Sequence, residues 1–337
     1  MEPDPVFNLA DCRPISLVDS ATGSVVVGAE DLALDRDGAR VIVSAYDRRR
    51  VEAETRANSA AISGGGLYSI ALAKLAAQTP SLTVTSLVEP TELTGGLHPH
   101  GISFDSKTRT VSFINRGYQR EANRWRMTPT VVHLGAGGVL SIVKSPMPCS
   151  INDLSVRDEH MLISFDHAEC GWRAGFEDVV GLRRSGLVDH DGKTLLSGVG
   201  YANGVIELAA GQVLVAATRE KSLRVVDVSD AAATSTRRFN LRGAPDNLSV
   251  SDDGAIVVAV HPSLLQLAFA RRLGIGKSQS RVLEFDFNTG GQKLLFEDPK
   301  ATLMSSATAA ILTGDMLVIG SVIDAGLVVC KKSGAGK

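Results

Sequence analysis

The fold is decided by the stretch GAEDLALDRDGARVIV, residues 28–43. Two short apolar runs, Leu32-Ala33-Leu34 and Val41-Ile42-Val43, flank the dipeptide Asp37-Gly38. Asp-Gly supplies the positive φ angles that a tight two-residue turn requires, so this stretch predicts a β-hairpin. A polar pair, Glu30-Asp31, precedes the first apolar run and would stand at the start of the first strand.

A module of this kind occurs six times along the chain. Each copy begins with a short polar opening, and the six openings are Gly28-Ala29-Glu30-Asp31-Leu32, His98-Pro99-His100-Gly101-Ile102, Ser150-Ile151-Asn152-Asp153-Leu154, Tyr201-Ala202-Asn203-Gly204-Val205, Pro245-Asp246-Asn247-Leu248 and Ser305-Ser306-Ala307-Thr308. Measured between residues 31, 101, 153, 204, 247 and 307, the steps are 70, 52, 51, 43 and 60 residues. A repeat of about 50 residues that is rich in short strands is typical of propeller blades.

Six such units predict an all-β fold, a six-bladed β-propeller with four-stranded blades around a central channel. We expect a single domain over residues 1–337, with the ring closed by pairing of the N-terminal and C-terminal strands. Two β-sandwiches are the competing architecture, but six copies exceed what a two-domain division predicts. Because the innermost strand of each propeller blade starts at the same end of the channel, the six openings should converge there.

The composition excludes several classes of protein. The chain has 337 residues, 44% hydrophobic and 21% charged, which is typical of a globular protein. A net charge of −2, no basic block and only 5% aromatic residues argue against a nucleic-acid partner. The most apolar late stretch, Ala309 to Cys330, is interrupted by Asp315 and Asp324, so no transmembrane segment is expected. The sequence carries no signal for an oligomeric state.

The N-terminus bears on the cellular location. Residues Met1 to Asn8 include Glu2 and Asp4 and lack the basic and apolar regions of a secretory signal. The chain as written is therefore expected to be cytoplasmic. A form trimmed of its leader would look the same, so export remains the alternative.

The converging openings are rich in oxygen donors. They contribute Glu30, Asp31, His100, Asn152, Asp153, Asn203, Asp246 and Asn247. Buried carboxylates need a counter-charge, and no Lys or Arg occupies the equivalent positions. A set of many oxygen ligands selects a hard cation and favours Ca²⁺ over Mg²⁺. The channel is therefore predicted to bind calcium.

At these residues the sequence resembles the paraoxonase/arylesterase family of calcium-dependent six-bladed lactonases, and more distantly the gluconolactonase and strictosidine-synthase-like propellers. The resemblance runs through nearly the whole chain. Besides the openings it includes Ser103, His261-Pro262 and the late stretch Val318-Ile319-Gly320. It implies two calcium ions, one catalytic and one structural.

The resemblance assigns the metal ligands residue by residue. The expected ligands of the catalytic calcium are Glu30, Asn152, Asn203, Asp246 and Asn247. The expected ligands of the structural calcium are Asp31, Asp153 and the backbone carbonyl of Ile102.

The same resemblance implies the catalytic residues. His100 corresponds to the histidine assigned to water activation, and His261, Asp166 and His167 correspond to polar residues that line the active site. Asn152 and Asn203 would stabilise the oxyanion through their amide nitrogens, and Asp246 completes the expected catalytic set. Arg116 stands where the family has a second histidine, and a guanidinium cannot relay a proton at neutral pH.

The cysteines give one expected disulfide. Cys12 and Cys330 match the end-to-end disulfide of the family, which should stabilise the fold by about 3 to 5 kcal/mol in the chain-entropy model. A formed disulfide would favour an exported protein. Cys149 and Cys170 have no evident partner and are expected to be core thiols. Residues 262–274 form a short amphipathic pattern, which predicts either a lid helix or a packed helix.

The primary functional hypothesis is a calcium-dependent hydrolase of lactones and activated aryl esters, with a small-molecule substrate. Calcium would polarise the carbonyl and His100 would activate water. A Gly-x-Ser-x-Gly string is absent, so no serine-nucleophile elbow is expected. The alternatives are a sugar-lactone or phosphotriester hydrolase, and, from another class, a non-catalytic propeller that binds a partner and holds calcium structurally.

Overall fold

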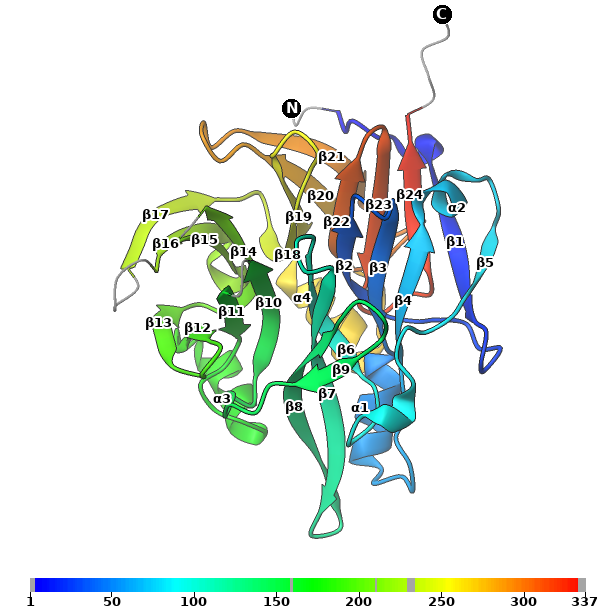
Figure 1. Ribbon diagram of the computed structural model, residues 1–337. Coiled ribbons are helices and arrows are strands. Elements are labelled where there is room, and N and C mark those ends of the chain that lie inside the picture. Colours follow the sequence, from blue (N-terminus) through cyan, green and yellow to red (C-terminus); the bar gives the residue numbers. More distant parts are fainter. Residues whose placement is uncertain (1–3, 158–159, 210, 229–233, 333–337) are drawn as a thin grey trace, which may run out of the picture.

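A computed structural model describes residues 4–157, 160–209, 211–228 and 234–332. The strands form six sheets arranged around a common axis, which confirms the predicted six-bladed β-propeller (Figure 1). The six innermost strands are β2 (Ala29–Asp35), β6 (Pro99–Asp105), β10 (Ile151–Arg157), β14 (Ala202–Ala209), β18 (Ala244–Val250) and β22 (Ala307–Thr313). Each predicted opening thus lies at the start of an innermost strand.

The remaining strands follow outward in chain order within each blade. The second strands are β3 (Arg40–Ala45), β7 (Thr110–Glu121), β11 (His160–Phe165), β15 (Gln212–Ala217), β19 (Ile256–His261) and β23 (Met316–Ser321). The third strands are β4 (Gly66–Ala71), β8 (Arg124–Leu134), β12 (Ser185–Asp189), β16 (Ser222–Asp227), β20 (Ser280–Phe285) and β24 (Leu327–Lys331). Four blades add an outer strand, namely β9 (Leu140–Ile142), β13 (Thr194–Val199), β17 (Thr234–Asn240) and β21 (Gln292–Asp298).

Apolar side chains of neighbouring sheets interlock to form the core. Leu214 of β15, Leu248 of β18 and Val258 of β19 belong to one buried cluster, so blades four and five share a core layer. Five of the six second strands are buried along nearly their whole length, as in β19, where every residue is buried, whereas the last residues of β7 are exposed. Runs such as Ile256-Val257-Val258 suit a strand covered on both faces, because β-branched side chains pack well against a pleated surface.

The two ends of the chain meet in the last blade. Strand β1 (Cys12–Asp19) pairs antiparallel with β24 and supplies the fourth strand of that blade. Cys12 lies opposite Cys330, and the two form a disulfide across 318 residues of sequence. Strand β5 (Ser81–Val84) pairs in parallel with the other side of β1, so the first blade keeps only β2, β3 and β4 in its own sheet.

The main helices gather at one end of the propeller. Helix α1 (Arg48–Arg56), helix α3 (Trp172–Val180) and helix α4 (Leu264–Ala268) each connect a second strand to a third strand. These connections lie at the end where the innermost strands begin, and the long β7–β8 hairpin joins them there (Figure 1). The predicted helical segment 262–274 consists of α4 followed by a π-helical turn, Phe269–Leu273.

Shorter helical elements complete the fold. They are α2 (Leu72–Ala76), η1 (Leu9–Asp11), η2 (Pro90–Glu92) and η3 (Thr218–Glu220). Among the described residues, no helix combines the length and the apolar character needed to cross a bilayer.

Candidate functional site

All six innermost strands carry a local irregularity at their polar opening. The pairing with the second strand shifts between Ala29 and Asp31, Pro99 and Ile102, Ile151 and Leu154, Ala202 and Val205, Pro245 and Leu248, and Ala307 and Ala309. A β-bulge re-aims side chains that strict alternation would send to opposite faces. This local feature explains how neighbours such as Asn152 and Asp153 can both serve the channel.

Two glycines let the inner strands approach closely. A Cβ on Gly101 would lie 2.5 Å from Cα of Asp153 and 2.6 Å from the carbonyl oxygen of Asn152. A Cβ on Gly204 would lie 2.6 Å from the carbonyl oxygen of Asp246. In both cases the neighbour belongs to the next blade, so the glycines bring adjacent polar openings together.

The structure brings the five expected ligands of the catalytic calcium into one buried group. We call Glu30, Asn152, Asn203, Asp246 and Asn247 the axial cluster. Every member is at most 6% exposed, although the group comes from four different blades.

The amide nitrogens of the axial cluster all donate hydrogen bonds. Nδ2 of Asn203 donates to Oδ1 of Asp246, and Nδ2 of Asn247 donates to the backbone carbonyl of Glu30 at 3.0 Å. Nδ2 of Asn152 donates to Oδ2 of Asp166, also at 3.0 Å. Among the described residues, Oδ1 of Asn203 and Oδ1 of Asn247 have no hydrogen-bond partner. Buried oxygens without partners are costly, so Oδ1 of Asn203 and Oδ1 of Asn247 are candidate ligands of a cation.

The surroundings of His100 also fit a bound cation. Burial and the charge of Arg116 lower the pKa of His100 to about 4, so the ring is neutral at pH 7 and carries one N–H. That ring faces two oxygens, Oε2 of Glu30 at 2.8 Å from Nδ1 and Oδ1 of Asn152 at 3.1 Å from Nε2. One proton cannot satisfy both oxygens, and a cation bound to either of them would remove the conflict.

The donor set of the axial cluster fits calcium. Burial alone would raise the pKa of Glu30, but His100 and Arg48 outweigh it and lower this pKa to about 2, so the carboxylate is ionised at neutral pH. In the described part of the chain, no group of three or more His, Cys, Asp or Glu side chains is placed to hold a metal. The cluster instead combines two carboxylates with amide oxygens, a mixture that suits Ca²⁺ and not Zn²⁺.

The expected ligands of the structural calcium hold neighbouring blades together. The carboxylate of Asp31 accepts the N–H of Leu32 and the N–H of Ile102, both at 2.8 Å. The carboxylate of Asp153 accepts the N–H of Leu154 and the N–H of Val205, both also at 2.8 Å. Each carboxylate thus links its own inner strand to that of the next blade.

The same two carboxylates are electrostatically strained. Burial and the charge of Asp153 raise the pKa of Asp31, and burial and the nearby Glu30 raise the pKa of Asp153. Carboxylate oxygens have further lone pairs beyond those that accept the backbone N–H groups. A cation between Asp31 and Asp153 would relieve their repulsion.

Two Asp–His pairs lie at the axial cluster. Asp246 of the first pair is a member of the cluster, and Asp166 of the second accepts a hydrogen bond from the member Asn152. Nε2 of His261 lies 2.6 Å from Oδ2 of Asp246, and Nδ1 of His167 lies 2.6 Å from Oδ1 of Asp166. When the imidazole of His261 is neutral, donation from Nε2 to Asp246 leaves a lone pair on Nδ1. That Nδ1 atom has no partner among the described residues.

Two cavities open onto these groups. The smaller, about 490 Å³, is lined by Glu30, Asn152, Asn203, Asp246 and His261 together with residues of α4. The larger, about 1450 Å³, is lined by α1, the β7–β8 hairpin and the start of α3, and it includes Asp166 and His167. Arg48 and Tyr201 line both cavities, so the two adjoin.

His100 differs from His261 and His167 in its relation to the cavities. It is buried and lines neither of these two cavities, whereas His261 lines the smaller one. His100 is the histidine to which the family resemblance assigns water activation. In the structure its two ring nitrogens face the side chains of Glu30 and Asn152.

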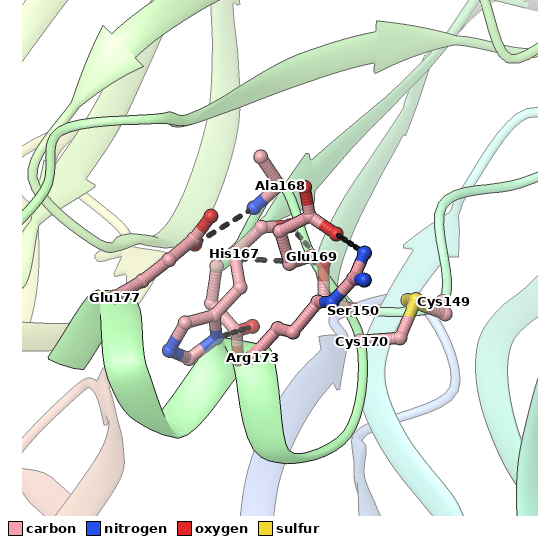
Figure 2. The surroundings of a disulfide bond; sticks show 9 residues. Cys149, Ser150, His167, Ala168, Glu169, Cys170, Arg173 and Glu177 are labelled. Atoms are coloured by element: carbon pink, nitrogen blue, oxygen red, sulfur yellow. Dashed lines mark hydrogen bonds and ion pairs between the residues drawn. A yellow bond between two sulfur atoms is a disulfide. The ribbon is translucent and has the colours of Figure 1, made fainter.

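The expectation that Cys149 and Cys170 lack partners is wrong, because they form a disulfide. Figure 2 shows that this bond ties the residue before Ser150 to the segment that leads into α3. Oγ of Ser150 donates to the carbonyl of His167, and Oε2 of Glu177 accepts the N–H of Ala168 at 3.1 Å. The antiparallel pairing of β10 with β11 brings the two cysteines together, and no sequence spacing reveals that pairing.

Sequence reasoning missed three residues of the site. Thr308 lines the smaller cavity, and its hydroxyl donates to the backbone carbonyl of Glu30 at 2.8 Å. It lies in the sixth opening, so the repeat register could have identified it. Arg48 and Tyr201 also line the cavities, but no repeat marks Arg48 because it lies in an insertion between strands.

Comparison with known proteins supports the fold. No protein-family model matches the sequence, and no curated protein matches it closely. The solved structures that resemble it include a protein provisionally described as a gluconolactonase, with a TM-score of 0.56 and 13% identity over 97% of this chain and 94% of that one. A gluconolactonase from Xanthomonas campestris gives a TM-score of 0.54 and 15% identity over 98% and 97% of the two chains.

A third similar structure is named as a lyase and not as a lactonase. Virginiamycin B lyase from Staphylococcus aureus gives a TM-score of 0.50 and 12% identity over 90% of this chain and 94% of that one. At such identities the likeness establishes the fold alone. The chain is therefore a six-bladed propeller with gluconolactonase-type structural neighbours, and the finer resemblance to paraoxonases stays a prediction.

Proposed function

We propose that this chain is a calcium-dependent hydrolase of lactones and related esters. The observation that carries the proposal is the axial cluster at the wall of a cavity, where buried oxygens of Asn203 and Asn247 lack partners beside a histidine oriented by a carboxylate. The gluconolactonase name of a structural neighbour favours lactones as the first substrates to test.

The residues have separate roles in this proposal. Glu30, Asn152, Asn203, Asp246 and Asn247 would hold the ion, and Ca²⁺ would supply Lewis-acid polarisation of the substrate carbonyl. Nδ1 of His261 accepts the proton of the attacking water, while Asp246 fixes the ring through Nε2. His100 orients Glu30 and Asn152.

The assignment of the base can be tested with two variants. His261→Gln keeps a donor toward Asp246 but removes the basic Nδ1, so we expect kcat to fall by about 10² to 10⁴-fold with calcium still bound. His100→Gln is expected to weaken calcium binding and to change kcat less at saturating calcium. The reverse pattern would return the role of base to His100.

The function itself is tested by hydrolysis of a lactone panel that includes gluconolactone, together with phenyl acetate and a phosphotriester. Rates are measured before and after EDTA, and again after calcium is restored to the stripped protein. We expect lactone hydrolysis that disappears with EDTA and returns with calcium. Calcium-dependent stabilisation without hydrolysis of any of these compounds would favour the non-catalytic binding propeller instead.

A further inference from the structure

The larger cavity is lined by a buried arginine that forms no ion pair with any residue described. Arg116, on β7, is 4% exposed and lines this cavity. Toward the residues described, it donates one long hydrogen bond, from Nη2 to the carbonyl of Ile151 at 3.4 Å, and its Nε has no partner among them. A guanidinium has five N–H groups, and leaving them unpaired in a buried site is costly.

Two other arginines of the same cavity are paired with acids. Arg271 lies 3.4 Å from Glu52, and Arg126 lies 3.1 Å from Glu121. Among the described residues, no carboxylate lies within ion-pair distance of Arg116.

The position of Arg116 links this charge to the proposed chemistry. The carbonyl to which it donates belongs to Ile151, the residue directly before Asn152 of the axial cluster. Arg48, which lines both cavities, also has no carboxylate within ion-pair distance among the residues described. A bound calcium ion would add further positive charge on the same side.

We infer that the substrate is an anion, a lactone or ester whose own carboxylate is held by Arg116 next to the axial cluster. The guanidinium can donate two parallel N–H···O bonds to a carboxylate, whereas a neutral substrate offers no pair of carboxylate oxygens to accept them. Arg48, which lines both cavities, adds a second guanidinium to their walls. This inference rests on the proposed function, because it names the substrate class of the same site.

The test compares two substrates of nearly the same size, one with a charged carboxylate and one with a neutral carboxamide. The substrates are γ-butyrolactone with a carboxylate on its ring and the same lactone with a neutral carboxamide. We expect Arg116→Gln to lower kcat/KM for the carboxylate by about 10²-fold and for the carboxamide by less than about threefold. Arg116→Lys should recover only part of the loss because it lacks the planar fork. An equal loss on both substrates would overturn the inference.

A matched control is available in the same cavity. Arg126 is 72% exposed and paired with Glu121, so Arg126→Gln should leave the preference for the carboxylate unchanged. A loss of preference in this variant equal to that of Arg116→Gln would show a diffuse effect of net charge and would refute a specific role for Arg116.

A binding measurement separates this inference from the proposed function. Pyroglutamate is a cyclic carboxylate with an amide in place of the lactone ester, and its binding to the calcium-loaded wild type and to Arg116→Gln can be followed by calorimetry. Binding that weakens at least tenfold in the variant supports the anion site even if no lactone is hydrolysed. Hydrolysis of neutral lactones, with no carboxylate preference and no effect of Arg116→Gln on pyroglutamate, would refute the anion site and leave the hydrolase standing.

Discussion

The close approach of the inner strands gives a prediction that depends on geometry alone. In Gly101→Ala the new Cβ would lie 2.5 Å from Cα of Asp153 and 2.6 Å from the carbonyl oxygen of Asn152. Carbon atoms pack best at about 3.5 to 4.0 Å, so blades two and three must separate by about 1 Å at the axis. Both obstructing atoms are backbone, and a closed ring limits their retreat.

The expected cost follows from this overlap. Overpacking a dense interior costs typically about 1 to 3 kcal/mol, and we expect the upper end, about 3 kcal/mol, because no flexible side chain can give way. Urea unfolding measures the change, and calcium titration should show weaker binding because Asn152 moves. Gly204→Ala, whose Cβ would lie 2.6 Å from the carbonyl oxygen of Asp246, should behave similarly.

A matched glycine provides the control. Gly175 lies in α3, and a Cβ there would meet nothing within 4 Å. Gly175→Ala should therefore be neutral or stabilising by up to about 1 kcal/mol. If Gly101→Ala changed the free energy of unfolding by less than about 1 kcal/mol, the argument from close approach at the axis would be refuted.

Three further predictions concern the metal and the disulfides. Glu30→Gln should lower calcium affinity at least tenfold by calorimetry and remove calcium-dependent stabilisation; unchanged affinity would exclude Glu30 as a ligand. Replacing Cys12 and Cys330 by serine should lower the free energy of unfolding by about 5 kcal/mol in the chain-entropy model, measured by denaturation without reductant. Replacing Cys149 and Cys170 should cost about 3 kcal/mol, because the closed loop is shorter, and should reduce lactone turnover; full activity would show that this clamp does not position the site.

The propeller could be predicted because the same polar opening followed by a short strand recurs along the sequence. The six openings, which include Glu30-Asp31, Asn152-Asp153 and Asp246-Asn247, follow one another at steps of 43 to 70 residues, and the structure places each of them on an innermost strand. The bulges could not be predicted, because a register shift depends on pairing with the second strand and leaves no fixed residue pattern. Yet these bulges are what allow two consecutive polar residues to serve one channel.

The residues that line the cavities could not be predicted from the sequence for a related reason. They are built by α1, the β7–β8 hairpin and α3, which are insertions that differ from blade to blade. Repeat analysis finds what the blades share, and substrate contacts lie in what they do not share. The partner of Cys149 was missed in the same way, since Cys170 lies in one of these insertions.

The distribution of charge along the channel ties the two proposals together. The carboxylates of Asp31 and Asp153 are buried and line neither cavity, those of Glu30 and Asp246 line the smaller cavity, and the unpaired guanidinium of Arg116 lines the larger one. Both cavities carry charges of both signs, because Arg48 lines both of them and Asp166 lines the larger one. A hydrolysed lactone leaves as a carboxylate, so the guanidinium of Arg116 that would hold an anionic substrate would also retain its product. Product release is therefore the step that we expect to limit turnover if the substrate is an anion.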